Sequence, residues 1–304
     1  MKNSGIGGQA LMEGVMMRNG SVYACAVRKS DGEIAMMKEE YVPKLGSEKI
    51  RNIPFLRGPF IFINSLILGY KTLSWSAGFF MEEEEKDKGD SEKKKGSVSE
   101  NAVMSASILF ALALAVGLFI VLPAVLVRLM KSFITAGWAV SLLEGVIRIV
   151  IFLAYLLLIS RMEDIRRVFM YHGAEHKCIN CIEHGLPLTV ENVRKSTRLH
   201  KRCGTSFILF TLLVSIFVGI FLPKDPLLLR IVCKLIALPL VMSLSYEFIR
   251  LAGSTENKCI SALSKPGLWL QHITTREPSD DMIEVGIASV EAVFDWKEWE
   301  GASF

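Results

Sequence analysis

The feature that most constrains the fold of this chain is an uninterrupted run of 26 uncharged residues at positions 102–127. A helix rises 1.5 Å per residue, so this run is long enough to cross the roughly 30 Å hydrocarbon core of a bilayer. The whole sequence is 51% hydrophobic and 22% charged, which is too apolar for a typical soluble protein but leaves room for polar segments. We therefore expect a mainly α-helical integral membrane protein with additional segments outside the membrane.

Three further apolar segments predict about four transmembrane helices in all. The second candidate, residues 133–160, contains Glu144 and Arg148, which stand four positions apart and can pair on one helix face. The third, residues 203–223, has 21 uncharged residues. The fourth, residues 231–252, is weaker. Its charged residues are Lys234, Glu247 and Arg250. Together these segments predict a four-span bundle over residues 101–252.

The distribution of Lys and Arg predicts how this bundle is oriented. The loop of residues 161–202 contains nine of them, whereas the hairpins at 128–131 and 224–230 contain two each. Short loops rich in Lys and Arg stay in the cytoplasm. We therefore expect a multi-pass protein of the inner (plasma) membrane, with the 161–202 loop and both termini in the cytoplasm.

Composition also narrows the range of partners. The net charge is only +4, and no sustained basic stripe with interleaved aromatic residues indicates nucleic-acid binding. The lipid bilayer is the one partner that the sequence predicts; it indicates neither a protein partner nor an oligomeric state. Six cysteines are scattered along the chain, which favours free thiols over a disulfide framework.

The segments outside the bundle divide into four regions. Residues 1–53 predict a cytoplasmic Gly-rich segment, suited to tight turns or a close approach, and then a β-hairpin at 21–42 around Asp31-Gly32. Residues 54–80 predict an interfacial or re-entrant helix, because the uncharged stretch is short for a span; a full span to residue 80 is the alternative. Residues 81–100 read as a charged linker. Residues 253–304 read as a cytoplasmic tail with an amphipathic helix.

The strongest functional signal is the sequence Tyr-His-Gly-Ala-Glu-His-Lys at positions 171–177. It contains H-x-x-E-H, the inverted zincin pattern. On a helix, His172 and His176 lie one above the other on one face and can hold one divalent metal ion. Glu175 lies beside them, where it can act as a general base on a metal-bound water. The pattern predicts a metal centre, with zinc as the expected ion, at the cytoplasmic surface of the membrane.

The third metal ligand must come from elsewhere in the chain. Glu247 is our first candidate, because it is a carboxylate in an apolar run at the cytoplasmic end of the fourth span. It also lies about as far downstream as the third ligand of inverted zincins. His200, at the entrance to the third span, is the reserve. Glu13, in the Gly-rich segment, is a further option.

The same residues also allow interpretations that involve no metal and no catalysis. The two histidines could bind phosphate head groups or pair with carboxylates instead of a metal. Cys178 and Cys181 form a C-x-x-C beside them, and we expect buried free thiols there rather than a redox or metal site. The Glu144–Arg148 pair is expected to be structural, with a transport relay as the alternative.

Several long blocks of the sequence resemble the YqhQ-like proteins. This resemblance covers nearly the whole chain and implies a bacterial membrane protein of unknown function, of a kind often labelled a predicted metal-dependent enzyme. That family's H-P-R-C-G block has Pro where this chain has Lys201, which weakens the case for the adjacent His200 as a positioned ligand. The matching blocks are GGQALMEGVMMR (7–18), RGPFIFINSLILG (57–69), YHGAEHKCINCIEHG (171–185), HKRCGTSF (200–207) and TTREPSDD (274–281).

Three functions remain open at this point. The first is a membrane-embedded metal-dependent hydrolase acting on an unidentified substrate, with Glu175 as its base. The second is a non-enzymatic membrane scaffold or regulatory protein with a structural metal or none. The third is a transporter, although four spans without a visible repeat are few for that role.

Overall fold

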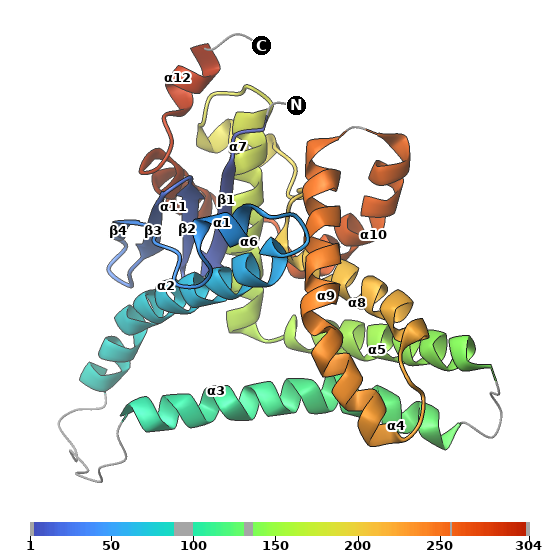
Figure 1. The fold of residues 1–304 in the computed structure, drawn as a ribbon. Helices are drawn as coiled ribbons and strands as arrows, with labels where there is room; N and C mark the ends of the chain where they lie inside the picture. The colour runs from blue at the N-terminus through green and yellow to red at the C-terminus, as the bar shows by residue number, and fades with distance from the viewer. Residues whose placement is uncertain (1–2, 88–99, 131–135, 256, 302–304) are drawn as a thin grey trace.

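The N-terminal part of the chain is a four-stranded antiparallel sheet in the computed structural model, which describes residues 3–87, 100–130, 136–255 and 257–301. The strands are β1 (Ile6–Leu11), β2 (Gly14–Asn19), β3 (Val22–Arg28) and β4 (Ile34–Glu40), in that spatial order (Figure 1). The predicted hairpin is confirmed as β3 and β4. For the Gly-rich segment before it we expected tight turns or a close approach. This segment instead forms a regular hairpin of β1 and β2.

Burial of both faces of the sheet explains why the first two strands were missed. Val15 and Met17 pack into a core shared with α6 (Glu163–Glu183) and α11 (Asp280–Glu291). Leu11 and Met16, on the other face, pack into a second core together with Leu68 of α2. A strand that is covered on both sides lacks the apolar–polar alternation by which strands are recognised in a sequence.

Helix α2 (Arg57–Asp87) follows the short helix α1 (Glu48–Asn52) and differs from the short helix that we expected. It is 31 residues long and continues past Lys71, whose side chain pairs with Glu39 of β4. Its buried positions Leu68, Thr72 and Ser76 recur every fourth residue and lie on one face of the helix. The helix therefore covers one face of the sheet.

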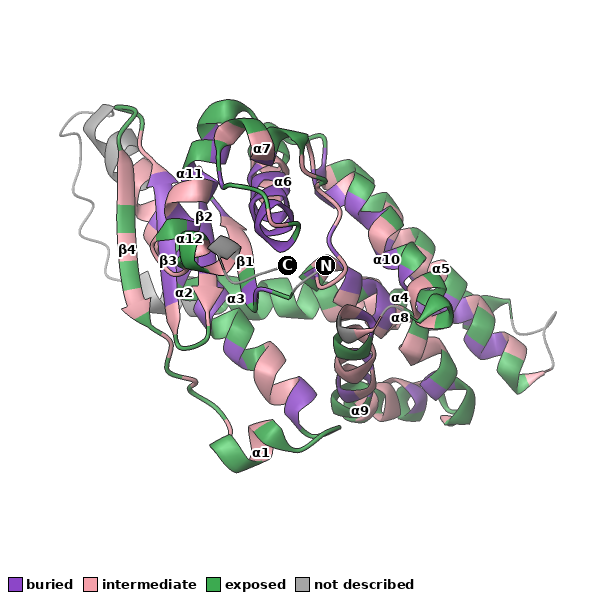
Figure 2. Cartoon of the chain, turned by 90° about the horizontal axis from the view of Figure 1, so that it is seen from above, coloured by how far each residue is buried: buried purple, intermediate pink, exposed green. Residues whose placement is uncertain are grey.

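Four helices are long and apolar enough to cross a membrane, in line with the sequence. They cover Ala106–Leu129, Gly137–Ile159, Gly204–Phe221 and Leu227–Gly253. The first combines part of α3 (Glu100–Val116), the π-helical turn η1 (Gly117–Val121) and α4 (Leu122–Leu129). The other three are α5 (Gly137–Ile159), α8 (Gly204–Phe221) and α9 (Leu227–Ser254). Exposed residues line the outer faces of these helices in Figure 2, whereas buried residues concentrate in the sheet and α6.

The remaining helices lie outside the four apolar ones. They are α6, α7 (Val190–Lys195), α10 (Lys258–Thr274), α11 and α12 (Trp296–Gly301). Helix α6 leaves the end of α5, lies beside β1 and packs on α11, while α10 packs on α8 (Figure 1). The sequence pattern did not predict α10. Of the expected charged linker, residues 88–99 lie outside the described part of the chain.

Candidate metal centre

Helix α6 carries the H-x-x-E-H motif, as the sequence predicts. His172 and His176 are one turn apart, and their ring centroids lie 4.4 Å from each other. Gly173, between them, permits a close approach of the chain after α10, since a Cβ there would lie 2.0 Å from the Arg276 carbonyl oxygen. The Arg276 amide in turn donates to the Phe169 carbonyl of α6 (2.8 Å). The motif is therefore fixed against the segment that follows α10.

Backbone carbonyls orient both imidazole rings. His172 Nδ1 lies 2.8 Å from the Thr274 carbonyl oxygen, and His176 Nδ1 lies 2.6 Å from the Arg198 carbonyl oxygen. A carbonyl oxygen can only accept, so both Nδ1 atoms carry the proton and donate it. Each Nε2 is then the atom left to bind a metal. This outer-shell arrangement is typical of metal-ligating histidines.

The third member of the group is Cys203, which the sequence analysis did not propose. Its Sγ lies 3.3 Å from His172 Nε2. Among the described residues, His172, His176 and Cys203 form a group whose potential ligand atoms all lie within 4.8 Å of one another. Zinc bonds of about 2.0–2.1 Å to nitrogen and 2.3 Å to sulfur place tetrahedral ligand atoms roughly 3.3–3.8 Å apart. The separations therefore fit a single ion after a small contraction.

The position of Cys203 in the fold explains its chemistry. It is the N-cap of α8, where its Sγ accepts a hydrogen bond from the Thr205 amide (3.4 Å). Burial would raise the pKa of the Cys203 thiol, but the charges of His172 and His176 outweigh burial and hold that pKa well below its usual range. A helix N-terminus also favours the thiolate. The residue is therefore prepared to bind a metal as an anion.

The charge of Cys203 acts in turn on His172. Burial would lower the pKa of His172, but the adjacent thiolate raises it to about 9. Without a metal, the two side chains thus form a thiolate–imidazolium pair. Metal binding at this site must release the proton from His172 Nε2.

Glu175 is buried next to this group and contacts the first strand of the sheet. A Cβ added to Gly8 of β1 would lie 2.8 Å from Glu175 Cγ and 2.9 Å from its Cδ, so only glycine fits there. The Gly8 amide acts to lower the pKa of the carboxylate. Burial raises the pKa of Glu175 above its ordinary value, opposed by the charges of His176 and His172. The Gly-rich segment was expected to allow a close approach, and at Gly8 it approaches this carboxylate.

Glu247 does not lie with the two histidines, contrary to our expectation. It accepts hydrogen bonds from the Arg57 guanidinium (2.7 Å to Nε) and from the Phe55 amide (3.1 Å). Arg57 opens α2, and α2 packs against α9. The position of Glu247 in an apolar run correctly indicated that its carboxylate has a specific partner. That partner is Arg57, 190 positions earlier in the chain, and not a metal ion.

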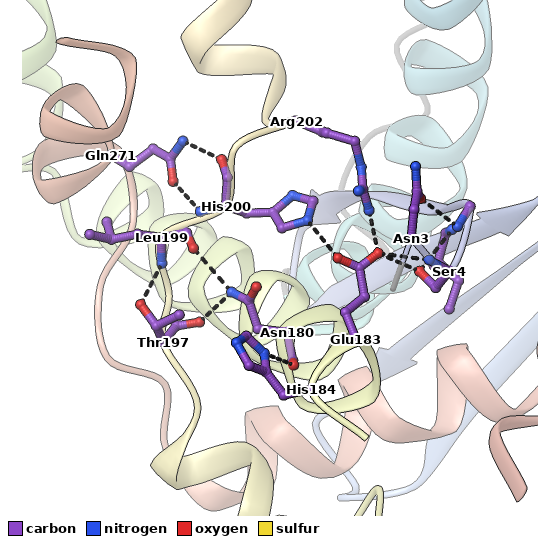
Figure 3. A network of polar contacts seen from close by, with 12 residues as sticks. Asn3, Ser4, Asn180, Glu183, His184, Thr197, Leu199, His200, Arg202 and Gln271 are labelled. Carbon is purple, nitrogen blue, oxygen red and sulfur yellow. Dashed lines mark hydrogen bonds and ion pairs between the residues drawn. The ribbon is translucent and has the colours of Figure 1, made fainter. Parts of the chain in front are cut away.

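His200, the reserve ligand, lies near the centre without joining it. Its ring centroid is 5.6 Å from that of His176, but its Nε2 faces Glu183 Oε2 at 3.7 Å (Figure 3). Gln271 holds the backbone of His200 from both sides: its Oε1 accepts from the His200 amide and its Nε2 donates to the His200 carbonyl, both at 2.8 Å. His200 therefore helps to fix the loop that leads to Cys203.

Glu183, the partner of His200, ties this loop to the N-terminus of the chain. Its Oε1 accepts from the Ser4 amide (2.9 Å) and hydroxyl (2.8 Å) and from the Arg202 guanidinium (Figure 3). Asn180, one turn earlier, donates to the carbonyls of Thr197 and Leu199. The end of α6 thus organises both the strand that contacts Glu175 and the loop that presents Cys203.

The remaining candidates, Glu13 and the cysteines of the C-x-x-C, make contacts that stabilise the fold. Glu13 binds the Arg167 guanidinium and accepts from the Tyr171 hydroxyl (3.2 Å), which links the β1–β2 turn to α6. Cys178 and Cys181 are fully buried in the core that α6 shares with the sheet and α11. These contacts account for both motifs without a metal.

One signal in the sequence could have pointed to Cys203. It is a cysteine immediately before an uncharged run, within Arg-Cys-Gly-Thr, at the end of the same predicted loop that carries the H-x-x-E-H motif. We considered the histidine of that block and not its cysteine. A Cys–His–His set is a recognised ligand chemistry for zinc, and three protein ligands leave one coordination position open.

Comparison with known proteins agrees with the resemblance noted above. Residues 53–296 match the family model described as "Protein of unknown function (DUF1385)". The chain belongs to this family. It is 37% identical over 288 residues to the "Uncharacterized protein YqhQ" of Bacillus subtilis (strain 168), covering 93% of this chain and 90% of that protein. No solved structure matches the chain. Membership in the DUF1385 family therefore carries no assigned activity, and any function must be argued from the site.

Proposed function

We propose that this protein is a membrane-embedded, zinc-dependent hydrolase with its active site at the cytoplasmic membrane surface. The observation that carries the proposal is the convergence of His172, His176 and Cys203, with the buried carboxylate of Glu175 beside them. Cys203 takes the place that we first gave to Glu247. Bound zinc would lower the pKa of its water to about 7 and polarise the scissile group.

The residues of the chain divide the remaining tasks. Glu175 accepts the proton of the attacking water and passes it to the leaving group. The Gly8 amide holds this carboxylate in place. The carbonyls of Thr274 and Arg198 keep both Nε2 atoms directed at the metal position. Because Cys203 immediately precedes a membrane-spanning helix, the substrate must reach the level of the membrane surface.

The number of ligands favours an enzyme over a scaffold with a structural metal. Structural zinc sites are closed by four protein ligands, and catalytic sites keep one position for water or substrate. Within the described part of the chain the group has three members. Glu175, whose pKa responds to the charges of His172 and His176, is at the position that a general base requires in the H-x-x-E-H pattern.

Elemental analysis of the purified protein tests the metal assignment. We expect about one zinc per chain in the wild type and in Glu175→Gln, and none in His172→Ala or Cys203→Ala. Cys178→Ala is the matched control, because it also removes a buried thiol, from the helix that carries the motif, but that thiol is not a proposed ligand. Glu247→Gln should also keep the metal. Zinc retained by Cys203→Ala, or lost from Glu247→Gln alone, would contradict the ligand set.

Cobalt substitution separates an open site from a closed one. A small chelating inhibitor such as acetohydroxamate should change the visible spectrum of the cobalt protein, because it occupies the open position. The spectrum should respond in Glu175→Gln as well, although that variant has no hydrolytic activity. An unchanged wild-type spectrum would mean a closed, structural site and would favour the scaffold function.

A cysteine nucleophile is the second function that the geometry favours. The 3.3 Å contact between Cys203 Sγ and His172 Nε2 also resembles an activated thiol with its acid–base partner. His176 would be dispensable in that mechanism and is required in the zinc mechanism. A His176→Ala variant that keeps both hydrolytic activity and rapid alkylation of Cys203 by iodoacetamide would establish the thiol mechanism and refute the zinc one.

The location of the protein completes the proposal. The four apolar helices would lie in the inner (plasma) membrane, with both termini and the metal centre in the cytoplasm. Support comes from the nine Lys and Arg residues of the 161–202 loop against two in each hairpin.

A further inference from the structure

A second polar cluster lies inside the bundle, between α5 and α9, and is made of other residues than the metal centre. Glu144 and Arg148 of α5 pair at 3.0 Å, as the sequence predicts. Arg230 and Lys234 of α9 also bind the Glu144 carboxylate. At 1.5 Å per residue, Glu144 and Arg148 stand about 10 and 16 Å from the start of α5. Three cations therefore share one carboxylate within the span.

This cluster carries more positive charge than its own carboxylate compensates. Glu144 and Arg230 are almost fully buried, and the side chains of Arg148 and Lys234 are 10% and 13% exposed. Arg148 donates to Ser215 (2.7 Å), but its Nε is buried without a partner. A buried charge is unfavourable unless it is paired. The surplus of cations predicts a further anion at this place.

Arg230 of this cluster also lines a cavity next to α4 and the start of α9, two elements that lie together at one end of the bundle (Figure 1). The volume of this cavity is about 10 Å³, which is room for one atom of the size of a water oxygen. Its basic residues are Arg128, Lys224 and Arg230, with Asp225 as the only carboxylate of its lining. The cluster and the cavity together have five basic side chains and two carboxylates.

The first turn of α9 adds a second, independent feature that favours an anion. Its N-cap is Pro226, which makes no side-chain capping bond. Helix N-termini attract anions because their first amides lack partners and the helix dipole is positive there. Leu227 and Arg230, both in this turn, line the cavity.

We propose that this place binds a phosphate-type group, which lies at the mouth beside Arg128 and presents one oxygen to Arg230. Lys224 adds only its charge, because its Nζ donates to the carbonyls of Gly219, Ile220 and Leu222. The cavity admits a single oxygen, so the rest of the group remains at the mouth. The group can come from an anionic phospholipid or from free phosphate. Basic pockets between transmembrane helices bind phospholipid head groups in other proteins.

Thermal unfolding of the full chain in a phosphate-free maltoside detergent tests the proposal. One arm adds sodium phosphate and another adds short-chain phosphatidylglycerol, with gluconate and chloride as reference anions at equal ionic strength. We expect an increase in Tm of about 5 °C at roughly a hundredfold excess over Kd. A shift with phosphate identifies the free anion as sufficient, and a shift with the lipid alone identifies the head group as the source.

Variants assign the shift to the cluster. Lys234→Met and Arg230→Gln should lose most of the shift, and Lys265→Met, an exposed lysine of α10, should keep it. Lys234→Met should also be at least as stable as the wild type in gluconate, because it removes uncompensated charge. Equal shifts in Lys234→Met and wild type, an equal response to chloride, or no response of the wild type to either phosphate compound would overturn the proposal. The wild-type measurements decide the question even if Arg230→Gln does not fold.

Discussion

Replacement of Glu183 by Gln should release the N-terminal strand from α6 without removing any metal ligand. Burial alone would raise the pKa of Glu183, but its interactions with His200, Ser4 and Arg202 lower it from 4.5 to about 2. At about 1.4 kcal/mol for each tenfold change in the equilibrium, this difference corresponds to roughly 3 kcal/mol of stabilisation at neutral pH. The side chain is fully buried, so solvent screening reduces this value little.

The dependence on pH follows from the direction of the shift. A carboxylate with a lowered pKa stabilises the folded state fully above its unfolded-state pKa, near 4.5. That contribution is lost as the pH falls from 4.5 through 2. The difference between wild type and Glu183→Gln should therefore be constant from pH 7 to about pH 5 and should shrink at lower pH.

Hydrogen exchange of the backbone amides at positions 4–8 measures the effect locally. We expect protection factors at pH 7 to fall by roughly a hundredfold in Glu183→Gln. Glu191→Gln is the matched control, since its partner Lys195 is exposed and the pair contributes little. An undiminished difference between wild type and Glu183→Gln at pH 3, or unchanged protection at pH 7, would refute the assignment of this stability to the Glu183 carboxylate.

Three further predictions concern the site and the topology. Gly8→Ala should retain zinc but lose hydrolytic activity by about a hundredfold, because the new Cβ would lie 2.8 Å from the Cγ of the general base; full activity would dismiss the role of this contact. Gly173→Ala should lose zinc and show a Tm several degrees lower, since its Cβ would meet the Arg276 carbonyl oxygen at 2.0 Å; metal analysis and thermal unfolding of the same sample measure both effects. In intact cells, a membrane-impermeant maleimide should label Asp225→Cys and not Ser196→Cys, and the reverse pattern would mean the opposite orientation.

The local part of the metal centre was predictable from sequence and the non-local part was not. The spacing of His172 and His176 fixes their relation on any helix, so their pairing follows from five adjacent residues. Cys203 reaches them only because the chain folds back after α6 and starts the apolar helix α8 at that point. Glu247 has the residue type and the spacing of an inverted-zincin ligand, but in the structure it forms an ion pair with Arg57. Sequence distance alone cannot distinguish these two outcomes.

The same distinction holds for the fold. Runs of uncharged residues identified the four apolar helices, because a membrane span needs only length and composition. The hairpin of β3 and β4 was recognisable by its Asp-Gly turn and half-exposed last strand. The β1–β2 hairpin and the full length of α2 were not recognisable from the sequence, because the residue pattern of each depends on the other. Helix α2 buries one face of the sheet, and the sheet in turn binds α2.

The carbonyl that orients His172 belongs to Thr274, and this has a consequence for how the protein is made. The groups that define the centre are supplied in order by positions 8, 172, 203 and 274, the last of them only after every membrane helix has been synthesised. A nascent chain that ends before α10 has the H-x-x-E-H motif but lacks the carbonyl that accepts from Nδ1 of its first imidazole. Loading of the proposed metal is therefore expected to be a late step of biogenesis, completed after the four apolar helices have been made, and prematurely terminated chains should leave the ribosome without it.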